Sequence, residues 1–316
     1  KDGSKDAGFN LGTAFNGKIY ASVIQTDGKI IVAGAFTTFN GISAGRMVRL
    51  NSDGSRDVSF DTSIAVGSGT IYGLALQSDG KLIVVGSFTK YNGTTVNRIA
   101  RVLGNGELDS TFATGSGSTT TIEDVTIAPD GKIVLSGTFN SFNGNSNYAK
   151  LVRLNTNGSI DSTFSIGTGF DDVVEAIAVQ PDGKIIAGGS FMNYNGTSQN
   201  RIVRLNTNGA VDSSFLSGTG FNDGAVHAIH VSSGGILIGG SFSDKYKNLD
   251  VNRLVLLNSN GTLNSNFDIG AGPSSATIYT LCESSDSFFV GGSFSLFDDL
   301  KQGKLAKLST TGELDS

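Results

Sequence analysis

Columns of Arg and Asp are the most regular candidates for chemistry in this chain. A guanidinium matches the geometry of a carboxylate, so regularly spaced partners predict salt bridges within or between repeated units. A ring of anion-binding arginines is the functional alternative, although Leu256 and Lys307 stand at the Arg position in the last two copies. The two columns are Arg49, Arg101, Arg153 and Arg204, and Asp57, Asp109, Asp161 and Asp212.

The two histidines are the other candidates for catalysis or metal binding. His227 and His230 lie three residues apart on an expected strand, where they point to opposite faces and cannot share a metal through that strand. Cys282 is the single cysteine, and no serine-nucleophile, phosphate-binding or zinc-protease motif is present. We therefore predict that the protein is not an enzyme and has no catalytic, cofactor-binding or metal-binding residues.

Oxygen-rich turns recur along the chain, as in Asn51-x-Asp53-Gly54-x-x-Asp57. Their acceptor spacing echoes a calcium loop but lacks the bidentate Glu and most of the charge. Asn-Gly and Asp-Gly are also preferred in tight hairpins, where both central residues take positive φ. We predict hairpin turns without a cofactor, and bound calcium is the weaker alternative.

The overall composition narrows the classes of partner. The chain has 23 Lys plus Arg against 28 Asp plus Glu, so no basic stripe can neutralise nucleic-acid phosphates. No apolar run approaches the roughly 18 residues needed for membrane insertion. Surface residues are mostly Ser, Thr, Asn and Gly, which favours an extracellular, cell-surface or virion location.

A repeat of 51 or 52 residues must position these side chains. Its clearest mark is Gly-Ser-Phe or a close variant, and a second Phe position follows in each copy. Both Phe positions are expected in the core. The first set is Phe36, Phe88, Phe139, Phe191, Phe242 and Phe294, and the second is Phe9, Phe60, Phe112, Phe164, Phe215 and Phe267.

Each copy reads as four short strands. In the fourth copy we expect strands over 174–180, 185–191 and 201–206, with a short fourth segment ending at Phe215. This predicts an all-β, six-bladed β-propeller of four-stranded blades forming a single domain over residues 1–316. We expect the N-terminal segment 2–9 to complete the last blade; a cut from a longer array is the rival interpretation.

The fourth copy also carries a family resemblance. Its marks are Asp182-Gly183-Lys184, Gly188-Gly189-Ser190-Phe191, Asn195-Gly196, Arg204-Leu205-Asn206, Asn208-Gly209 and Asp212-Ser213-Ser214-Phe215. With these marks the chain resembles the delta-60 repeat β-propellers of secreted bacterial and phage proteins. The resemblance covers essentially the whole sequence and implies a fold, but no shared reaction.

Blades five and six lose the Asn-Gly loop, and we predict a partner-binding patch at Lys245, Tyr246, Lys247, Asp298 and Asp299. The resulting hypothesis is a non-enzymatic interaction or scaffolding module of a larger extracellular, cell-surface or virion assembly that contacts a protein partner. The alternative is a lectin-like receptor-binding domain, of a phage tail fibre or secreted adhesin, that binds glycans by stacking them on Tyr91, Phe142 and Tyr194.

Overall fold

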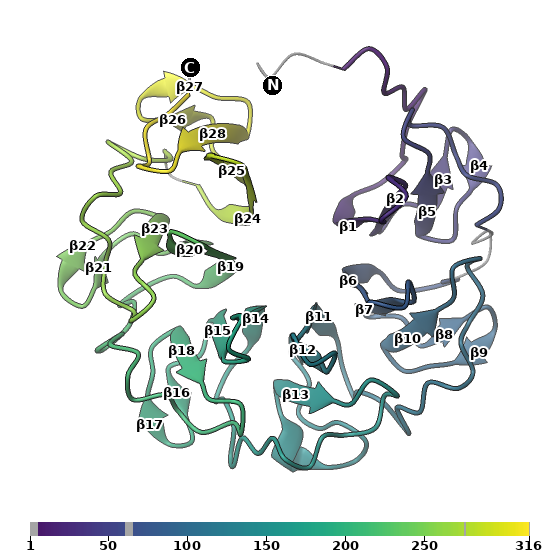
Figure 1. The fold of residues 1–316 in the computed structure, drawn as a ribbon, viewed down its shortest axis with the longest axis horizontal. Helices are drawn as coiled ribbons and strands as arrows, with labels where there is room; N and C mark the ends of the chain where they lie inside the picture. The colour runs from purple at the N-terminus through teal and green to yellow at the C-terminus, as the bar shows by residue number, and fades with distance from the viewer. Residues whose placement is uncertain (1–5, 61–65, 275, 316) are drawn as a thin grey trace. The chain divides into compact units, whose positions relative to one another are not determined.

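A three-stranded antiparallel sheet is the recurring element of the structure, a computed structural model that describes residues 6–60, 66–274 and 276–315. Figure 1 shows these sheets along the chain, and we number repeats 1 to 6 by them. The first strands are β1 Ile19–Ile24, β6 Ile71–Leu76, β11 Ile122–Ile127, β14 Val174–Val179, β19 Val226–Ser232 and β24 Ile278–Ser284. The middle strands are β2 Ile30–Gly34, β7 Leu82–Gly86, β12 Ile133–Gly137, β15 Ile185–Gly189, β20 Gly235–Gly240 and β25 Ser287–Gly292. The third strands are β5 Met47–Leu50, β10 Ile99–Val102, β13 Leu151–Leu154, β18 Ile202–Leu205, β23 Leu254–Leu257 and β28 Leu305–Ser309.

A short hairpin of two-residue strands, called the outer hairpin below, adds a second small sheet to most repeats. These hairpins are β3 Thr38–Phe39 with β4 Ile42–Ser43, β8 Lys90–Tyr91 with β9 Thr94–Thr95, β16 Asn193–Tyr194 with β17 Thr197–Ser198, β21 Lys245–Tyr246 with β22 Leu249–Asp250, and β26 Leu296–Phe297 with β27 Leu300–Lys301. In repeat 3 the 3-10 helix η1 Ser146–Tyr148 follows the corresponding turn. None of the described residues forms a helix long and apolar enough to span a membrane.

The predicted four-stranded blade is not confirmed, because the fourth segment adds no regular strand to the three-stranded sheet. In repeat 4 it forms a single bridge, Leu205 to Val211, and then turns. The Asp212 carboxylate accepts a hydrogen bond from Ser214 N at 3.0 Å and closes that turn. After the equivalent turn in repeat 2, Ala113 N donates to Asn157 O of repeat 3. The fourth segment therefore joins the next repeat.

The Asp-Gly turns also differ from the predicted geometry. Gly183 has a φ of 82° and its N–H donates to Gln180 O, but Asp182 does not take positive φ. This is the three-residue hairpin in which only the Gly is left-handed. Positive φ at both central residues occurs instead in the outer hairpin, at Asn195 and Gly196.

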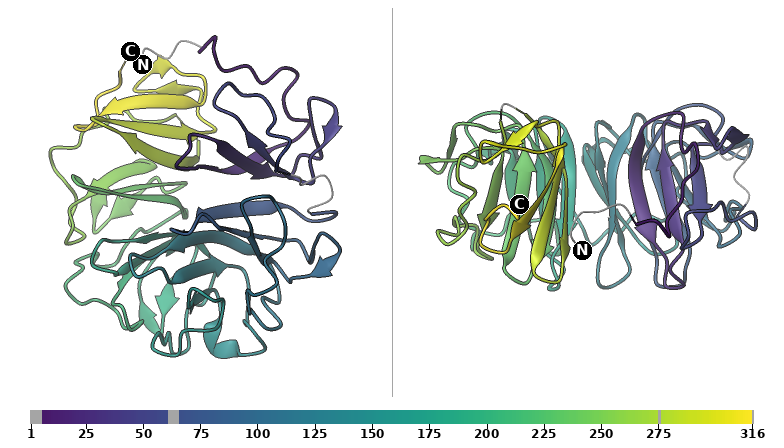
Figure 2. Two further views of the ribbon diagram at one scale, coloured as in Figure 1. Left: turned by 45° about the vertical axis from the view of Figure 1, so that its right-hand side comes forward. Right: turned by 90° about the horizontal axis from the view of Figure 1, so that it is seen from above.

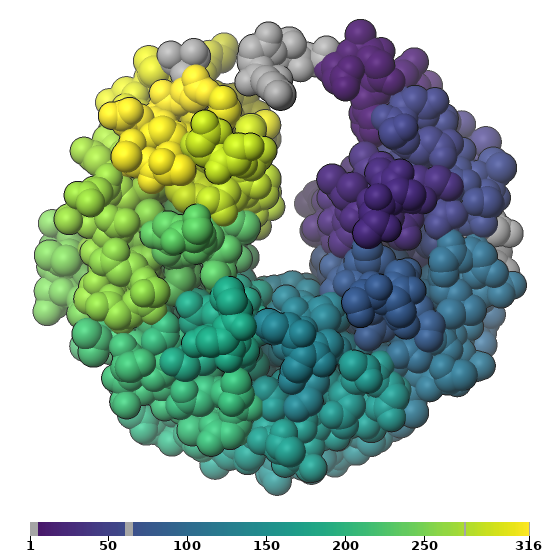
Figure 3. All heavy atoms as spheres, viewed as in Figure 1, coloured from purple at the N-terminus to yellow at the C-terminus, as the bar shows by residue number. Residues whose placement is uncertain are grey.

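The chain divides into two compact units, 1–127, 131–146 and 152–161 in the first, and 128–130, 147–151 and 162–316 in the second. Within each unit the sheets of neighbouring repeats pack face to face, as β14, β19 and β24 do in the second (Figure 2). Figure 3 shows the same repeats in continuous contact from green to yellow. The middle strands are covered on both faces, which explains their continuous apolar sequence.

The first Phe column is confirmed as core, since all six rings are at most 1% exposed. The second column is only partly buried as a set. Phe60, Phe164 and Phe215 are buried, whereas Phe112 and Phe267 are half-buried. Of the segment 2–9 that was predicted to complete the last blade, residues 2–5 lie outside the described residues. Phe9 packs beside the core of repeat 1, and pairing with the last blade stays a prediction.

Candidate functional site

The Arg and Asp columns form ion pairs, as the sequence predicts. In repeat 2, Arg101 Nε donates to Asp109 Oδ2 at 2.8 Å, and Lys81 Nζ lies 3.3 Å from the same oxygen. The Arg101 and Asp109 side chains are 7% and 6% exposed. Burial raises the pKa of Asp109, but hydrogen bonds from Thr111 and the charge of Arg101 outweigh it, so the pKa falls well below its usual value.

The same arginine also joins adjacent repeats. Arg101 Nη1 donates to Thr156 O of repeat 3 at 2.6 Å, and its guanidinium carbon lies 4.7 Å from the Phe112 ring centroid. Arg49 contacts Gly104 and Phe60 in this way, and Arg204 contacts Ser259 and Phe215. These donors are used within the protein, so the column serves the fold and not an anion site.

Repeat 5 departs from this pattern and contains a pocket. Leu256 and Asn264 occupy the positions that Arg101 and Asp109 hold in repeat 2. The pocket has a volume of about 520 Å³, against about 310 Å³ for the hollow at the same repeat positions in repeat 2. In repeat 2 the Arg101 guanidinium lies over the Phe112 ring, whereas Leu256 stands at that position beside Phe267 in repeat 5. The sequence change thus replaces a buried ion pair with a buried leucine and an amide, and the hollow beside them is larger.

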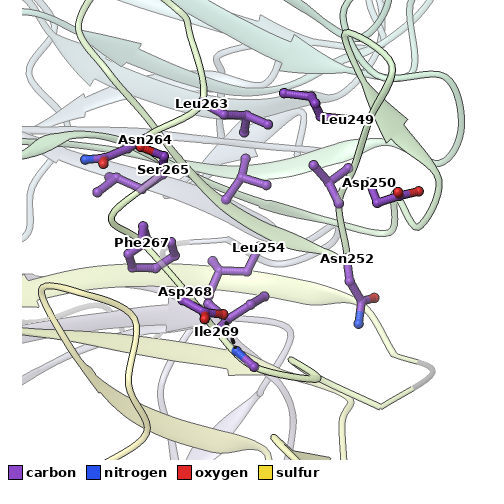
Figure 4. A pocket seen from close by; sticks show the side chains of 14 residues that line it. Leu249, Asp250, Asn252, Leu254, Leu263, Asn264, Ser265, Phe267, Asp268 and Ile269 are labelled. Atoms are coloured by element: carbon purple, nitrogen blue, oxygen red, sulfur yellow. Dashed lines mark hydrogen bonds between the residues drawn. The ribbon is translucent and has the colours of Figure 1, made fainter.

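The pocket wall is apolar and its edge is acidic and amide-rich (Figure 4). Leu254, Leu263 and Phe267 gather in the interior, and Leu249 of β22 reaches the opening with 55% of its surface exposed. The polar edge comprises Asp250, Asn252, Asn264, Ser265 and Asp268. An apolar group could therefore enter while a neighbouring positive charge or N–H group meets the edge.

One predicted partner-binding residue is internal. Tyr246 is fully buried, its hydroxyl donates to Gly261 O at 2.6 Å, and burial raises the pKa of its phenol. The prediction that Tyr246 contacts a partner is therefore wrong. Its ring packs against Phe221, with centroids 4.7 Å apart.

The other four predicted residues lie at the surface of the two outer hairpins. Lys245 Nζ pairs with the Asp250 carboxylate at the pocket edge. Lys247 Nζ donates to Leu216 O at 2.7 Å. Asp298 Oδ1 accepts from Ala271 N, and Asp299 is exposed at a φ of 59°. Their partner binding stays a prediction, although three of them already have intramolecular contacts.

The rings predicted to stack on sugars are unavailable at the surface. Tyr91, Phe142 and Tyr194 are 0% exposed. The Tyr91 and Tyr194 hydroxyls donate to Gly106 O and Gly209 O at 2.7 and 2.5 Å. Large rings beside Asn-Gly turns are repeat-core residues here, so glycan stacking on these three is wrong.

The sequence of the repeat matches the model of a known protein family. The family model described as a domain of unknown function (DUF5122) beta-propeller matches residues 25–60, 77–112, 128–164, 180–215 and 232–267. The chain belongs to the DUF5122 β-propeller family. No curated protein matches its sequence.

Solved structures share the fold of this propeller at low sequence identity. Virginiamycin B lyase from Staphylococcus aureus is 15% identical with a TM-score of 0.56, over 96% of this chain and 85% of that one. The designed Ika8 protein is 13% identical with a TM-score of 0.54, over 95% and 73%. PorZ, a surface component of the Porphyromonas gingivalis type-IX secretion system, is 13% identical with a TM-score of 0.51, over 99% and 43%.

These likenesses correct the prediction that the protein is not an enzyme. Virginiamycin B lyase has the same fold, so propeller architecture does not separate binding modules from enzymes. The prediction also relied on the absence of familiar motifs. Motifs describe residues close in sequence, whereas residues one propeller repeat apart become neighbours only after folding.

The two histidines illustrate this point. His227 Nδ1 lies 2.5 Å from Glu175 Oε2 on β14, and His230 Nε2 lies 3.3 Å from Glu283 Oε2 on β24. They contact different neighbouring strands, as alternation on a strand predicts. Sequence reasoning missed both acidic partners. The available signal was the repeat register, since Glu175 and His227 are 52 residues apart.

The oxygen-rich turns use their acceptors locally. Asp53 Oδ1 accepts from Ser55 N and Ser55 Oγ at 2.9 and 2.6 Å, and these hydrogen bonds lower its pKa. Within 6–60, 66–274 and 276–315, no three His, Cys, Asp or Glu residues are arranged to hold a metal ion. The prediction of turns without a cofactor and its weaker alternative, bound calcium, both stay untested.

Proposed function

We propose that this propeller is a protein-interaction module of a larger extracellular, cell-surface or virion assembly. The supporting observation is the pocket of repeat 5, where an inter-repeat arginine has been replaced by Leu256. It lies beside β21–β22, one of the two outer hairpins whose sequence departs from the repeat. A position that other repeats use for cohesion is here open to a ligand.

The proposed partner segment carries an aliphatic side chain next to a Lys or Arg. Leu254, Leu263 and Phe267 would bury the aliphatic group. The exposed carboxylates of Asp250 and Asp268 would favour the adjacent positive charge. An extended segment fits this arrangement because apolar and charged residues can meet an apolar interior and a polar edge in succession.

Two finer assignments accompany this proposal. We propose that the six repeats correspond to six blades, and that the family is the same as the delta-60 repeat propellers. The five family-model matches and the Gly-Ser-Phe periodicity support both. Membership of secreted bacterial or phage proteins then gives the proposed location.

Peptide display is the first test of the interaction. Selection of random peptides on the whole chain is expected to enrich an aliphatic residue flanked by Lys or Arg. The selected peptide, measured by fluorescence anisotropy, should lose binding to Leu256→Arg/Asn264→Asp, because that double variant rebuilds the pair found in repeat 2. Equal binding to the double variant would overturn the pocket as the site.

A matched control separates the pocket from general surface hydrophobicity. Leu249 and Ile42 occupy the same hairpin position in repeats 5 and 1 and are 55% and 61% exposed. Leu249→Ser should weaken peptide binding about tenfold, corresponding to loss of one partly buried aliphatic contact. Ile42→Ser should leave peptide binding unchanged, since the Arg49–Asp57 pair occupies the equivalent positions in repeat 1.

A further inference from the structure

A polar cluster joins repeats 4, 5 and 6 within the second compact unit. Glu175 on β14, His227 on β19 and Tyr279 on β24 stand at one repeat position, 52 residues apart in succession. The His227 ring lies 5.9 Å from the Tyr279 ring, which is 60% exposed. The His227 and Glu175 side chains are 23% and 25% exposed, so solvent reaches the cluster.

A chain of hydrogen bonds fixes how the imidazole is used. Glu175 Oε2 lies 2.5 Å from His227 Nδ1, which places the Nδ1 proton toward the carboxylate. His227 Nε2 then carries the lone pair, and it lies 3.3 Å from Ser241 Oγ. Ser241 Oγ already accepts a hydrogen bond from Ala225 N at 2.9 Å, so its own proton is free to point at Nε2.

The carboxylate end of this chain is held in its charged form. Ser190 Oγ donates to Glu175 Oε1 at 2.7 Å. Burial raises the pKa of Glu175, but the hydrogen bonds from His227 and Ser190 outweigh it, and the pKa lies below its usual value. An ionised carboxylate on Nδ1 orients the ring with Nε2 toward the Ser241 hydroxyl, as a base that serves a hydroxyl requires.

The equivalent serines in other repeats show what is special about Ser241. Ser87 and Ser293 hold the same repeat position, and each accepts a backbone N–H, from Thr70 and Thr277. The residues at the His227 position in those repeats are Tyr72 and Tyr279. The backbone contact is therefore the structural role of the serine in repeats 2 and 6, and the imidazole beside it is an addition in repeat 5.

We propose that Ser241, His227 and Glu175 form a nucleophile, base and positioning carboxylate that transfer acyl groups from carboxylic esters to water. The exposed Tyr279 ring beside the imidazole favours esters with a flat aromatic leaving group. This activity uses residues separate from the pocket of repeat 5, so it stands apart from the proposed interaction.

The chemistry balances with water as the only co-reactant. Ser241 Oγ attacks the ester carbonyl carbon as its proton moves to His227 Nε2, and the carbon–alkoxy bond then breaks as that proton passes to the departing alcohol. A water molecule next gives a proton to Nε2, and its oxygen attacks the acyl carbon. The Oγ–carbon bond breaks, Ser241 regains the proton and a carboxylic acid leaves.

An alkyl fluorophosphonate is the probe for the nucleophile. Attack by Ser241 Oγ forms an Oγ–phosphorus bond and releases fluoride with the hydroxyl proton. Mass spectrometry of the labelled chain is expected to find one adduct, on the Ser241 peptide, and Ser241→Ala should lose it. His227→Gln should slow labelling at least about 100-fold, the usual contribution of a general base.

Ser87→Ala and Ser293→Ala are the matched controls, because each loses the same backbone contact without an imidazole nearby. Both should label at the wild-type rate. No adduct on the intact chain, equal labelling of the three serines, or a His227→Gln rate equal to wild type would each overturn the proposal. Thermal unfolding of each variant separates loss of reactivity from loss of fold.

A pair of substitutions tests Glu175 as a positioning residue. The groups facing His227 are Glu175 from β14, Ser241 after β20 and Tyr279 from β24. Labelling and p-nitrophenyl acetate hydrolysis should both depend on the Glu175 carboxylate. Glu175→Gln should slow both reactions, whereas Glu175→Asp keeps a carboxylate and should restore part of the rate. Equal rates for Glu175→Gln and the wild type would remove Glu175 from the relay.

Discussion

At the scale of single residues, the Arg101–Asp109 pair is a cohesive contact whose two halves depend on each other. Arg101→Leu should destabilise the fold by about 3–5 kcal/mol, because it deprives the buried Asp109 carboxylate of its guanidinium partner and removes the hydrogen bond to repeat 3. The double variant Arg101→Leu/Asp109→Asn, which copies repeat 5, should cost less. Denaturant unfolding measures both, and equal losses would contradict the coupling.

The buried tyrosine hydroxyl offers a smaller residue-scale test. Tyr194→Phe removes the donor to Gly209 O and should cost about 0.5–1.5 kcal/mol. Repeat 3 already has Phe142 at this position, so the ring alone fits the core. A shift in denaturation midpoint with an unchanged slope is expected. No shift would mean that water replaces the tyrosine hydroxyl as the hydrogen-bond donor to Gly209 O.

At the scale of elements, the outer hairpin depends on one side chain at its left-handed turn. Asn195 has a φ of 54° and its Oδ1 accepts from Thr168 N at 2.8 Å, while Asp298 does the same for Ala271 N in repeat 6. Asn195→Asp should therefore be nearly neutral. Asn195→Ala should lose about 1–3 kcal/mol through backbone strain and the missing acceptor. Equal unfolding midpoints for the two variants would contradict this role.

The strands of repeat 4 show how far the sequence could predict the elements. Short apolar runs on either side of an Asp-Gly turn place the β14 and β15 strands within one or two residues, because these signals are local. The fate of the fourth segment was not predictable in this way, since Ala113 finds its partner one repeat later. Tyr246 was misplaced because a polar-looking loop sequence hides a ring whose hydroxyl is satisfied internally.

The candidate sites were predictable only in part for a related reason. Leu256 was visible in the sequence as a break in the Arg column, yet the pocket it leaves depends on side chains from two segments of repeat 5. The approach of Glu175 to His227 required knowing that equal repeat positions become neighbours. Both sites arise where one repeat differs from the others, and such differences show no local sequence pattern.

At the scale of the whole molecule, the ion-pair column should make stability sensitive to acid. The pKa values of Asp57, Asp109 and Asp212 all lie well below the ordinary value, because hydrogen bonds from neighbouring hydroxyl, ammonium and guanidinium groups outweigh burial. In the unfolded chain these carboxyls take up protons near their usual pKa of about 3.9. Their contribution is therefore fully present above pH 4 and is lost as the pH falls toward the folded values.

Thermal unfolding between pH 7 and pH 2.5 measures this loss. Each carboxylate can lower the unfolding free energy by up to about 1.4 kcal/mol per pH unit below pH 4, so the Tm should be flat above that point and fall steeply beneath it. Arg101→Leu/Asp109→Asn removes one of these titrating carboxylates and should give a shallower fall, whatever its stability at pH 7. Parallel curves for the variant and the wild type would show that acid sensitivity arises elsewhere than in the pairs that join the repeats.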